Sequence, residues 1–178
     1  MPRDTNTSTA FITKARGFLK EDYLPKIERC LAQLTDEQIW WRPNEQSNSI
    51  GNLVLHLCGN VRQWIVSGLG GEEDFRQRQS EFDERRVISK AELRTRLKSV
   101  LTKVDGTLAQ FDDSRLLETF QIQGTTVTAL EAIFHVTEHF SMHTGQIILL
   151  TKMITGTDLR FYDFSNGHPH HTWRTGVR

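Results

Sequence analysis

Apolar side chains recur at three- and four-residue intervals in four long segments of the chain, the spacing that gathers them on one face of a helix. No alternating apolar and polar pattern extends over any length, so the sequence predicts no substantial strand. The four segments run from about Ala10 to Leu34, Ser49 to Gly68, Ser89 to about Phe111 and Thr128 to about Ile154. Four amphipathic helices in one small domain predict an all-α fold, a four-helix bundle.

Capping residues mark the ends of these segments. Ser89 and Thr128 are each followed three residues later by glutamate, the capping-box pattern that opens a helix. Gly156 follows the last apolar position of the fourth segment and predicts its end. Pro25 lies inside the first segment and predicts a kink there, because proline lacks the amide hydrogen that a helix interior uses.

The remaining segments carry no helical period. We expect residues 1–9 to form a flexible N-terminus, residues 10–156 the four-helix bundle, and residues 157–178 a C-terminal tail that packs on the bundle. The connection from Leu69 to Val87 is rich in charged residues, a composition typical of a solvated loop or a frayed helix. Residues 120–124 predict a short turn or an extended piece.

Charge and cysteine content narrow the classes of partner and compartment. The 178 residues include 22 Lys plus Arg and 22 Asp plus Glu, and this balance argues against nucleic acid or an anionic membrane surface as a partner. No apolar run reaches the roughly 18 residues of a membrane span, and the polar first nine residues do not resemble a signal peptide. Cys30 and Cys58 lie in helical patterns outside any CxxC motif, so we expect two core thiols in a cytoplasmic protein.

Three histidines follow one another at four-residue spacing in the last predicted helix. His135, His139 and His143 lie about 40° apart around the helix axis and share one face with Gln146. Neighbours four apart on a helix are close enough for two imidazoles to bind one metal ion. A row of three cannot all reach one ion, so His135 is expected beside the site. The alternative without a metal ion is a stacked pair of histidines inside the bundle.

A further ligand has to come from another helix, and His56 is the best candidate. His56 and Asn60 border the apolar stripe of the second predicted helix, where a neighbouring helix can meet them. A single histidine at the edge of an apolar stripe is more often an ordinary partly buried residue, and it is the combination with His139 and His143 that favours a ligand. Three histidines that leave open coordination positions are typical of catalytic zinc, and nickel, iron or manganese also accept imidazole and water.

Two other histidine patterns require interpretation. Residues 135–139 match the inverted zinc-protease motif HxxEH, in which the glutamate is the general base. Such proteases use a further glutamate ligand downstream, and no glutamate follows Glu138, so we interpret the match as chance. The tail contains three more histidines, expected on its surface with a lid over the site as the alternative: His168, His170 and His171.

Two blocks of sequence resemble the DinB/YfiT-like superfamily, four-helix proteins regarded as metalloenzymes. Trp40–His56 reads WWRPNEQSNSIGNLVLH, and His135–Ile147 reads HVTEHFSMHTGQI. The resemblance implies that His56, His139 and His143 hold a divalent metal, zinc or nickel foremost with iron or manganese as alternatives. From their positions on the helix faces, we expect His135, Asn60 and Gln146 to lie around that metal. The resemblance also implies a homodimer and a bundle whose helices do not follow simple up-and-down order.

Characterised relatives in that superfamily include S-transferases that use a low-molecular-weight thiol. The resemblance therefore implies an enzyme for a small-molecule substrate, in which the metal binds a thiol and lowers its pKa. Substrate contacts would come from Asn60, His135, Arg62 or the tail. The alternative is a non-catalytic, stress-associated metal-binding homodimer. Metal-activated water is a further option, but it needs a base beside the ion, and Glu138 is poorly placed for that role.

Overall fold

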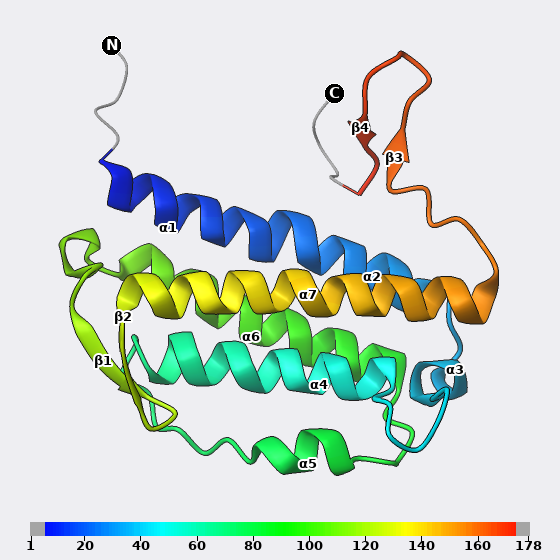
Figure 1. The fold of residues 1–178 in the computed structure, drawn as a ribbon, viewed down its shortest axis with the longest axis horizontal. Coiled ribbons are helices and arrows are strands. Elements are labelled where there is room, and N and C mark those ends of the chain that lie inside the picture. The colour runs from blue at the N-terminus through cyan, green and yellow to red at the C-terminus, as the bar shows by residue number, and fades with distance from the viewer. Residues whose placement is uncertain (1–5, 174–178) are drawn as a thin grey trace.

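The computed structural model describes residues 6–173, in which four long helices run side by side (Figure 1). The first is continuous and comprises α1 (Thr7–Gly17), the π-helical turn η1 (Phe18–Tyr23) and α2 (Leu24–Ala32). The others are α4 (Ile50–Val61) with its π-helical continuation η2 (Arg62–Ser67), α6 (Lys90–Gln110) and α7 (Ala129–Thr155). The predicted all-α four-helix bundle is confirmed.

Short elements connect the long helices. They are α3 (Asp36–Trp40), α5 (Arg78–Asp83), the 3₁₀ turn η3 (Asp113–Arg115) and two antiparallel hairpins, β1 (Thr119–Ile122) with β2 (Thr125–Thr128) and β3 (Tyr162–Asp163) with β4 (His170–His171). The turn of the first hairpin has positive φ at Gln123 (54°) and Gly124 (78°), the combination that suits a two-residue hairpin loop. The extended piece or turn expected at residues 120–124 corresponds to β1 and its turn, whereas β2, β3 and β4 were not predicted, because strands this short show no alternating pattern.

The first helix differs from its prediction at two points. It begins at Thr7, because the side chain of Asn6 caps it by accepting a hydrogen bond from the amide of Ser8. Residues 7–9, expected to be flexible, are therefore helical, and residues 1–5 lie outside the described residues. At Pro25, where the sequence predicts a kink, the helix runs on from a π-helical turn, and Pro25 occupies the start of α2, where its missing amide hydrogen is not needed.

The ends of the later helices follow the predicted caps. Thr128 and Glu131 make both hydrogen bonds of a capping box at the start of α7, and Gly156 ends that helix with a left-handed φ of 65°. At the start of α6 the Ser89 side chain accepts from the amide of Glu92.

The segment between α4 and α6 crosses the length of the bundle. Figure 1 shows α4 and α6 running in the same direction, with residues 68–89 returning along the outer side of α4 and forming α5 on the way. Helix α7 runs opposite to α4 and lies between it and the first helix. The helices therefore do not follow simple up-and-down order, and α5 covers α4 from outside.

The tail after α7 folds back onto the first helix. Leu159 is buried in the core cluster, and the Trp173 side chain is only 4% exposed and donates from Nε1 to Asp22 at 3.1 Å. Arg29 of α2 donates to the carbonyl oxygens of Arg160 and Thr172 at 3.0 Å and 2.6 Å. Within residues 6–173 no helix is both long and apolar enough to cross a membrane.

Candidate metal centre

Three histidines from two helices meet between α4 and α7. His56, His139 and His143 each offer one ring nitrogen, and these nitrogens lie within 4.8 Å of one another. The Nε2 atoms of His56 and His139 are 2.9 Å apart. Metal–nitrogen bonds of about 2.0–2.1 Å place tetrahedral ligands roughly 3.3 Å from one another. The three nitrogens are therefore close enough together to be ligands of one ion.

Hydrogen bonds on the far side of two rings fix which nitrogen faces the centre. His56 Nδ1 donates to Glu81 Oε2 at 2.8 Å, and His143 Nδ1 donates to Gln146 Oε1 at 2.7 Å. With the proton on Nδ1, each ring directs the lone pair of Nε2 toward the centre. His143 Nε2 is buried and has no hydrogen-bond partner among the described residues. A buried lone pair of this kind fits a metal ion, so this triad (His56, His139 and His143) can bind one.

The environment keeps the ligand rings of α7 neutral. Burial, together with the nearby His143 and His56 rings, lowers the pKa of His139 to about 3. Burial also lowers the pKa of His143, although its hydrogen bond to Gln146 opposes the shift. Neutral imidazole is the form that binds metal, so protons do not compete for these nitrogens near neutral pH.

Glu81 of α5 orients His56, a role that the sequence analysis missed. Arg76 donates to both of its carboxylate oxygens, from Nε at 2.8 Å and from Nη2 at 2.9 Å. Burial would raise the pKa of Glu81, but the hydrogen bonds and charges of Arg76 and His56 outweigh it and lower the pKa, so the carboxylate is ionised. The expectation of a solvated connection is wrong here, because the Glu81 residue is only 8% exposed.

Two residues of α4 determine where α5 and the Glu81 carboxylate lie. A Cβ atom on Gly59 would lie 1.8 Å from Glu81 Oε1, so only glycine admits the side chain there. Asn52 Nδ2 donates to the main-chain oxygens of Glu81 and Glu84 at 2.8 Å and 3.1 Å and holds α5 in place. Asn52 and Gly59, which stand among the apolar residues of this helix, were the signals in the sequence for this contact.

The remaining predicted site residues adjoin the triad. The His135 ring stacks on His139, with ring centroids 5.3 Å apart, and Asn60 Nδ2 lies 3.2 Å from His135 Nε2. The structure thus brings together the three predicted ligands and the three predicted neighbours. Glu138, the base of the HxxEH interpretation, is exposed and outside the triad.

Comparison with known proteins gives the family. The model of the family described as protein of unknown function (DUF1572) matches residues 6–168. This chain belongs to the DUF1572 family. A comparison with curated proteins finds no match for it.

The fold of this DUF1572 chain is that of DinB-like proteins. A DinB-like protein from Bacillus subtilis, YjoA, superimposes with a TM-score of 0.64 at 18% identity, over 84% of this chain and 97% of that chain. For a DinB-like protein from Bacillus cereus the TM-score is 0.62 at 17% identity, over 80% and 89%. A conserved protein from Enterococcus faecalis gives 0.65 at 17% identity, over 88% and 100%.

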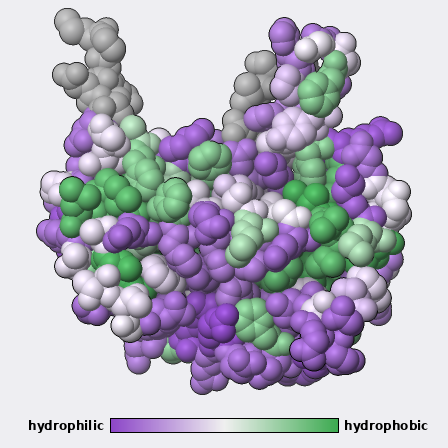
Figure 2. Space-filling model, viewed as in Figure 1, coloured by the Kyte–Doolittle hydropathy of each residue, from purple (hydrophilic) through white to green (hydrophobic). Residues whose placement is uncertain are grey.

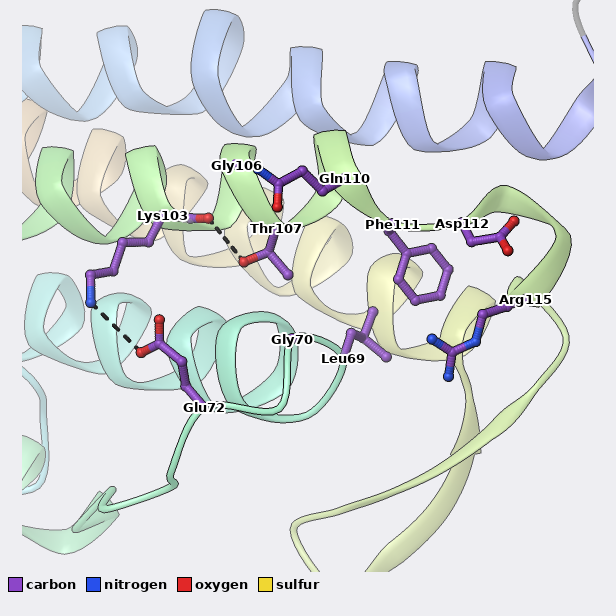
Figure 3. Close-up of a pocket in the computed structure, with 10 residues that line it drawn as sticks. All are labelled: Leu69, Gly70, Glu72, Lys103, Gly106, Thr107, Gln110, Phe111, Asp112 and Arg115. Atoms are coloured by element: carbon purple, nitrogen blue, oxygen red, sulfur yellow. Dashed lines mark hydrogen bonds and ion pairs between the residues drawn. The ribbon is translucent and has the colours of Figure 1, made fainter.

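Other features of the DUF1572 chain lie apart from the triad. The tail histidines, all exposed, belong to the segment anchored on α2. Both cysteines have a raised pKa through burial, to about 11 for Cys30 and about 12 for Cys58, which makes them poor nucleophiles. A cavity of about 460 Å³ opens between α6 and the chain after η2 (Figure 3). Its two cations are already paired, Lys103 with Glu72 and Arg115 with Glu118.

Proposed function

We propose that this protein is a divalent-metal-dependent enzyme of the DinB-like type that activates a low-molecular-weight thiol at the His56, His139 and His143 site. Zinc or nickel is the metal that we expect foremost, with iron or manganese as alternatives. Three neutral nitrogen ligands leave the charge of the ion uncompensated and a coordination position for an added ligand. A metal held in this way supplies Lewis acidity that lowers the pKa of a bound thiol.

One observation carries the proposal. His143 Nε2 is buried without a hydrogen-bond partner in the part of the chain that the structure describes, while His56 and His139 bring their Nε2 atoms to 2.9 Å from one another. Without an ion, two neighbouring rings have to share a proton, and the third leaves a lone pair unsatisfied. A cation satisfies all three at once, which accounts for three imidazoles held together between two helices of the bundle.

Metal titration of the untagged protein tests this proposal. We expect about one zinc or nickel ion per chain, by elemental analysis after dialysis, and loss of that ion in both His56→Ala and His143→Ala. His168→Ala, in the tail, is the matched control and should retain the ion. Absence of stoichiometric binding, or equal binding in all variants, would refute the metal site.

Thiol activation is tested separately on the cobalt-loaded protein. Cobalt(II) reports a bound thiolate by a new charge-transfer absorption, which we expect with 1-propanethiol near neutral pH. Stoichiometric metal that takes up no thiol would favour the alternative, a non-catalytic metal-binding protein.

We also propose that the protein is a homodimer that pairs through α7. Four large apolar side chains of α7 are exposed and lie within about 100° of one another on the helix: Phe134 (60%), Met142 (45%), Leu149 (60%) and Met153 (59%). Figure 2 shows apolar surface at both ends of one face of the molecule. Light scattering should give twice the chain mass for the native protein and the single mass for Leu149→Asp. A native monomer would contradict the proposal.

A further inference from the structure

A row of polar side chains continues from the triad along the contact between α4 and α7. Asn60 and Trp64 follow His56 at four-residue intervals on α4 and η2, so the three residues share one face. On α7, which runs in the opposite direction, His135 lies one turn before His139. Asn60 is 4% exposed and Trp64 is 8% exposed.

Two atoms of this row are buried and unsatisfied. Asn60 Oδ1 and Trp64 Nε1 have no hydrogen-bond partner among the described residues. His143 Nε2 is the third buried side-chain atom in that state, and the fourth is Thr144 Oγ1. Buried polar atoms are nearly always paired in folded proteins, and three of these four lie along one seam. Hydrogen-bonding capacity is therefore left free along the seam between α4 and α7.

The main chain at Trp64 has an uncommon conformation. Trp64 belongs to the π-helical η2, in which the amide of Gly68 bonds to the carbonyl of Gln63 at 2.9 Å, five residues earlier. Such π-helical turns inside α-helices are frequently found at functional sites. The Trp64 ring lies against the His135 ring, with centroids 4.1 Å apart and planes inclined by 37°. His135 in turn stacks on His139, so the row is continuous with the triad.

We propose that Asn60 and Trp64 form a subsite for a neutral amide group of the ligand whose other end reaches the triad. The Trp64 indole N–H donates to the amide oxygen, and Asn60 Oδ1 accepts from the amide N–H. A peptide-type amide carries one acceptor oxygen and one N–H donor, on opposite sides of its plane, so it offers one partner for each of the two buried atoms. The assignment of the reacting end rests on the proposed function, whereas the amide subsite rests on the two unpaired atoms.

The hydrogen-bond partner of Asn60 favours an amide over a carboxylate as the ligand group bound at this subsite. Asn60 Nδ2 donates to His135 Nε2 at 3.2 Å, which leaves Oδ1 as the free atom. A carboxylate would bring negative charge against this oxygen and offer it no hydrogen. If the Asn60 amide were turned over, two donors would face the ligand and a carboxylate would bind better. The two ligand types therefore give opposite results.

Nuclear magnetic resonance on the zinc-loaded protein tests the subsite directly. The indole N–H signal of Trp64, identified by its absence in Trp64→Phe, should shift in a saturable way with N-methylacetamide and not with acetate. The signal of Trp41, which is exposed on the protein surface, serves as the control. Asn60→Leu should remove the saturable shift and tests the same subsite if Trp64→Phe does not fold. No shift, or a stronger shift with acetate, would overturn the proposal.

A second experiment connects the subsite to the triad. On cobalt-loaded protein, N-acetylcysteamine carries an amide beyond its thiol, while 1-propanethiol lacks one. Trp64→Phe should weaken N-acetylcysteamine roughly three- to tenfold, the value of one hydrogen bond, and leave 1-propanethiol unchanged. Equal weakening of both thiols would overturn the subsite. If neither thiol changes the cobalt spectrum, thiol activation fails, and the N-methylacetamide titration still decides the subsite.

Discussion

His56 donates from Nδ1 to the Glu81 carboxylate at 2.8 Å, and this contact joins a segment outside the bundle to a metal-binding residue within it. Glu81 lies on α5, in the long connection that returns along α4. Carboxylates in this position fix the histidine tautomer and increase the basicity of the ligand nitrogen. The connection between α4 and α6 is therefore part of the site.

Removing the charge of Glu81 should weaken metal binding while the triad itself is intact. We expect Glu81→Gln to lower zinc affinity about tenfold, the lower end of such effects, because the amide oxygen still accepts from His56. Competition with a chromophoric chelator measures the affinity. Asp83→Asn, an exposed change on the same short helix, should have no effect. Equal affinity in both variants would show that Glu81 does not act on the site.

A methyl group at Gly59 should have the same effect on the metal without replacing any ionisable group. Its Cβ would overlap the Glu81 carboxylate, which has to move away from His56. We expect Gly59→Ala to lower zinc affinity as Glu81→Gln does. Gly106→Ala is the matched control, because nothing lies within 4 Å of its Cβ in α6. It should stabilise the protein by about 0.5–1 kcal/mol through helix propensity and leave zinc affinity unchanged.

Asp105 of α6 should make a small contribution to stability that depends on pH. Its hydrogen bonds with Arg16, at 2.7 Å, and Lys20 lower its pKa below the ordinary 3.8, although partial burial opposes this. The stabilisation is present above pH 3.8 and is lost as the pH falls through the lowered folded-state pKa. Urea unfolding should find Asp105→Asn less stable by about 0.5 kcal/mol near neutral pH, with the difference disappearing in acid. A difference that grew in acid would contradict this assignment.

The long helices and the triad could be predicted because their signals are local. Apolar spacing and a capping box such as Thr128 with Glu131 lie within a few residues of one another, and so do His139 and His143. The face of α4 that carries His56 was also readable from its apolar stripe. Features that depend on a single helix turn or a single helix face could therefore be predicted from the sequence.

Contacts that depend on tertiary structure could not be predicted in the same way. Glu81 and Arg76 lie in a charged run whose composition is that of a solvated loop, and Glu81 is separated from His56 by 25 residues. Only the path of the chain back along α4 makes them neighbours. The proposed role of Trp64 was hidden for another reason, since a tryptophan in the apolar stripe of Ser49–Gly68 has the pattern of a core residue.

Arg29 should hold the tail without influencing the metal. Its guanidinium donates to the carbonyl oxygens of Arg160 and Thr172, a planar fork that lysine cannot reproduce. Arg29→Lys should therefore release residues 157–173, and chymotrypsin should cleave at the exposed Tyr162 and Phe164 faster than in the native protein.

The same variant decides whether the tail histidines act as a lid. Because the tail is anchored on α2 and the triad lies between α4 and α7, zinc affinity in Arg29→Lys should equal that of the native protein. Arg94→Lys, which alters an ion pair with Glu28 on the bundle surface, is the control for general destabilisation. Weaker zinc binding in Arg29→Lys alone would mean that the tail reaches the site, and His168, His170 and His171 would then be the next residues to replace.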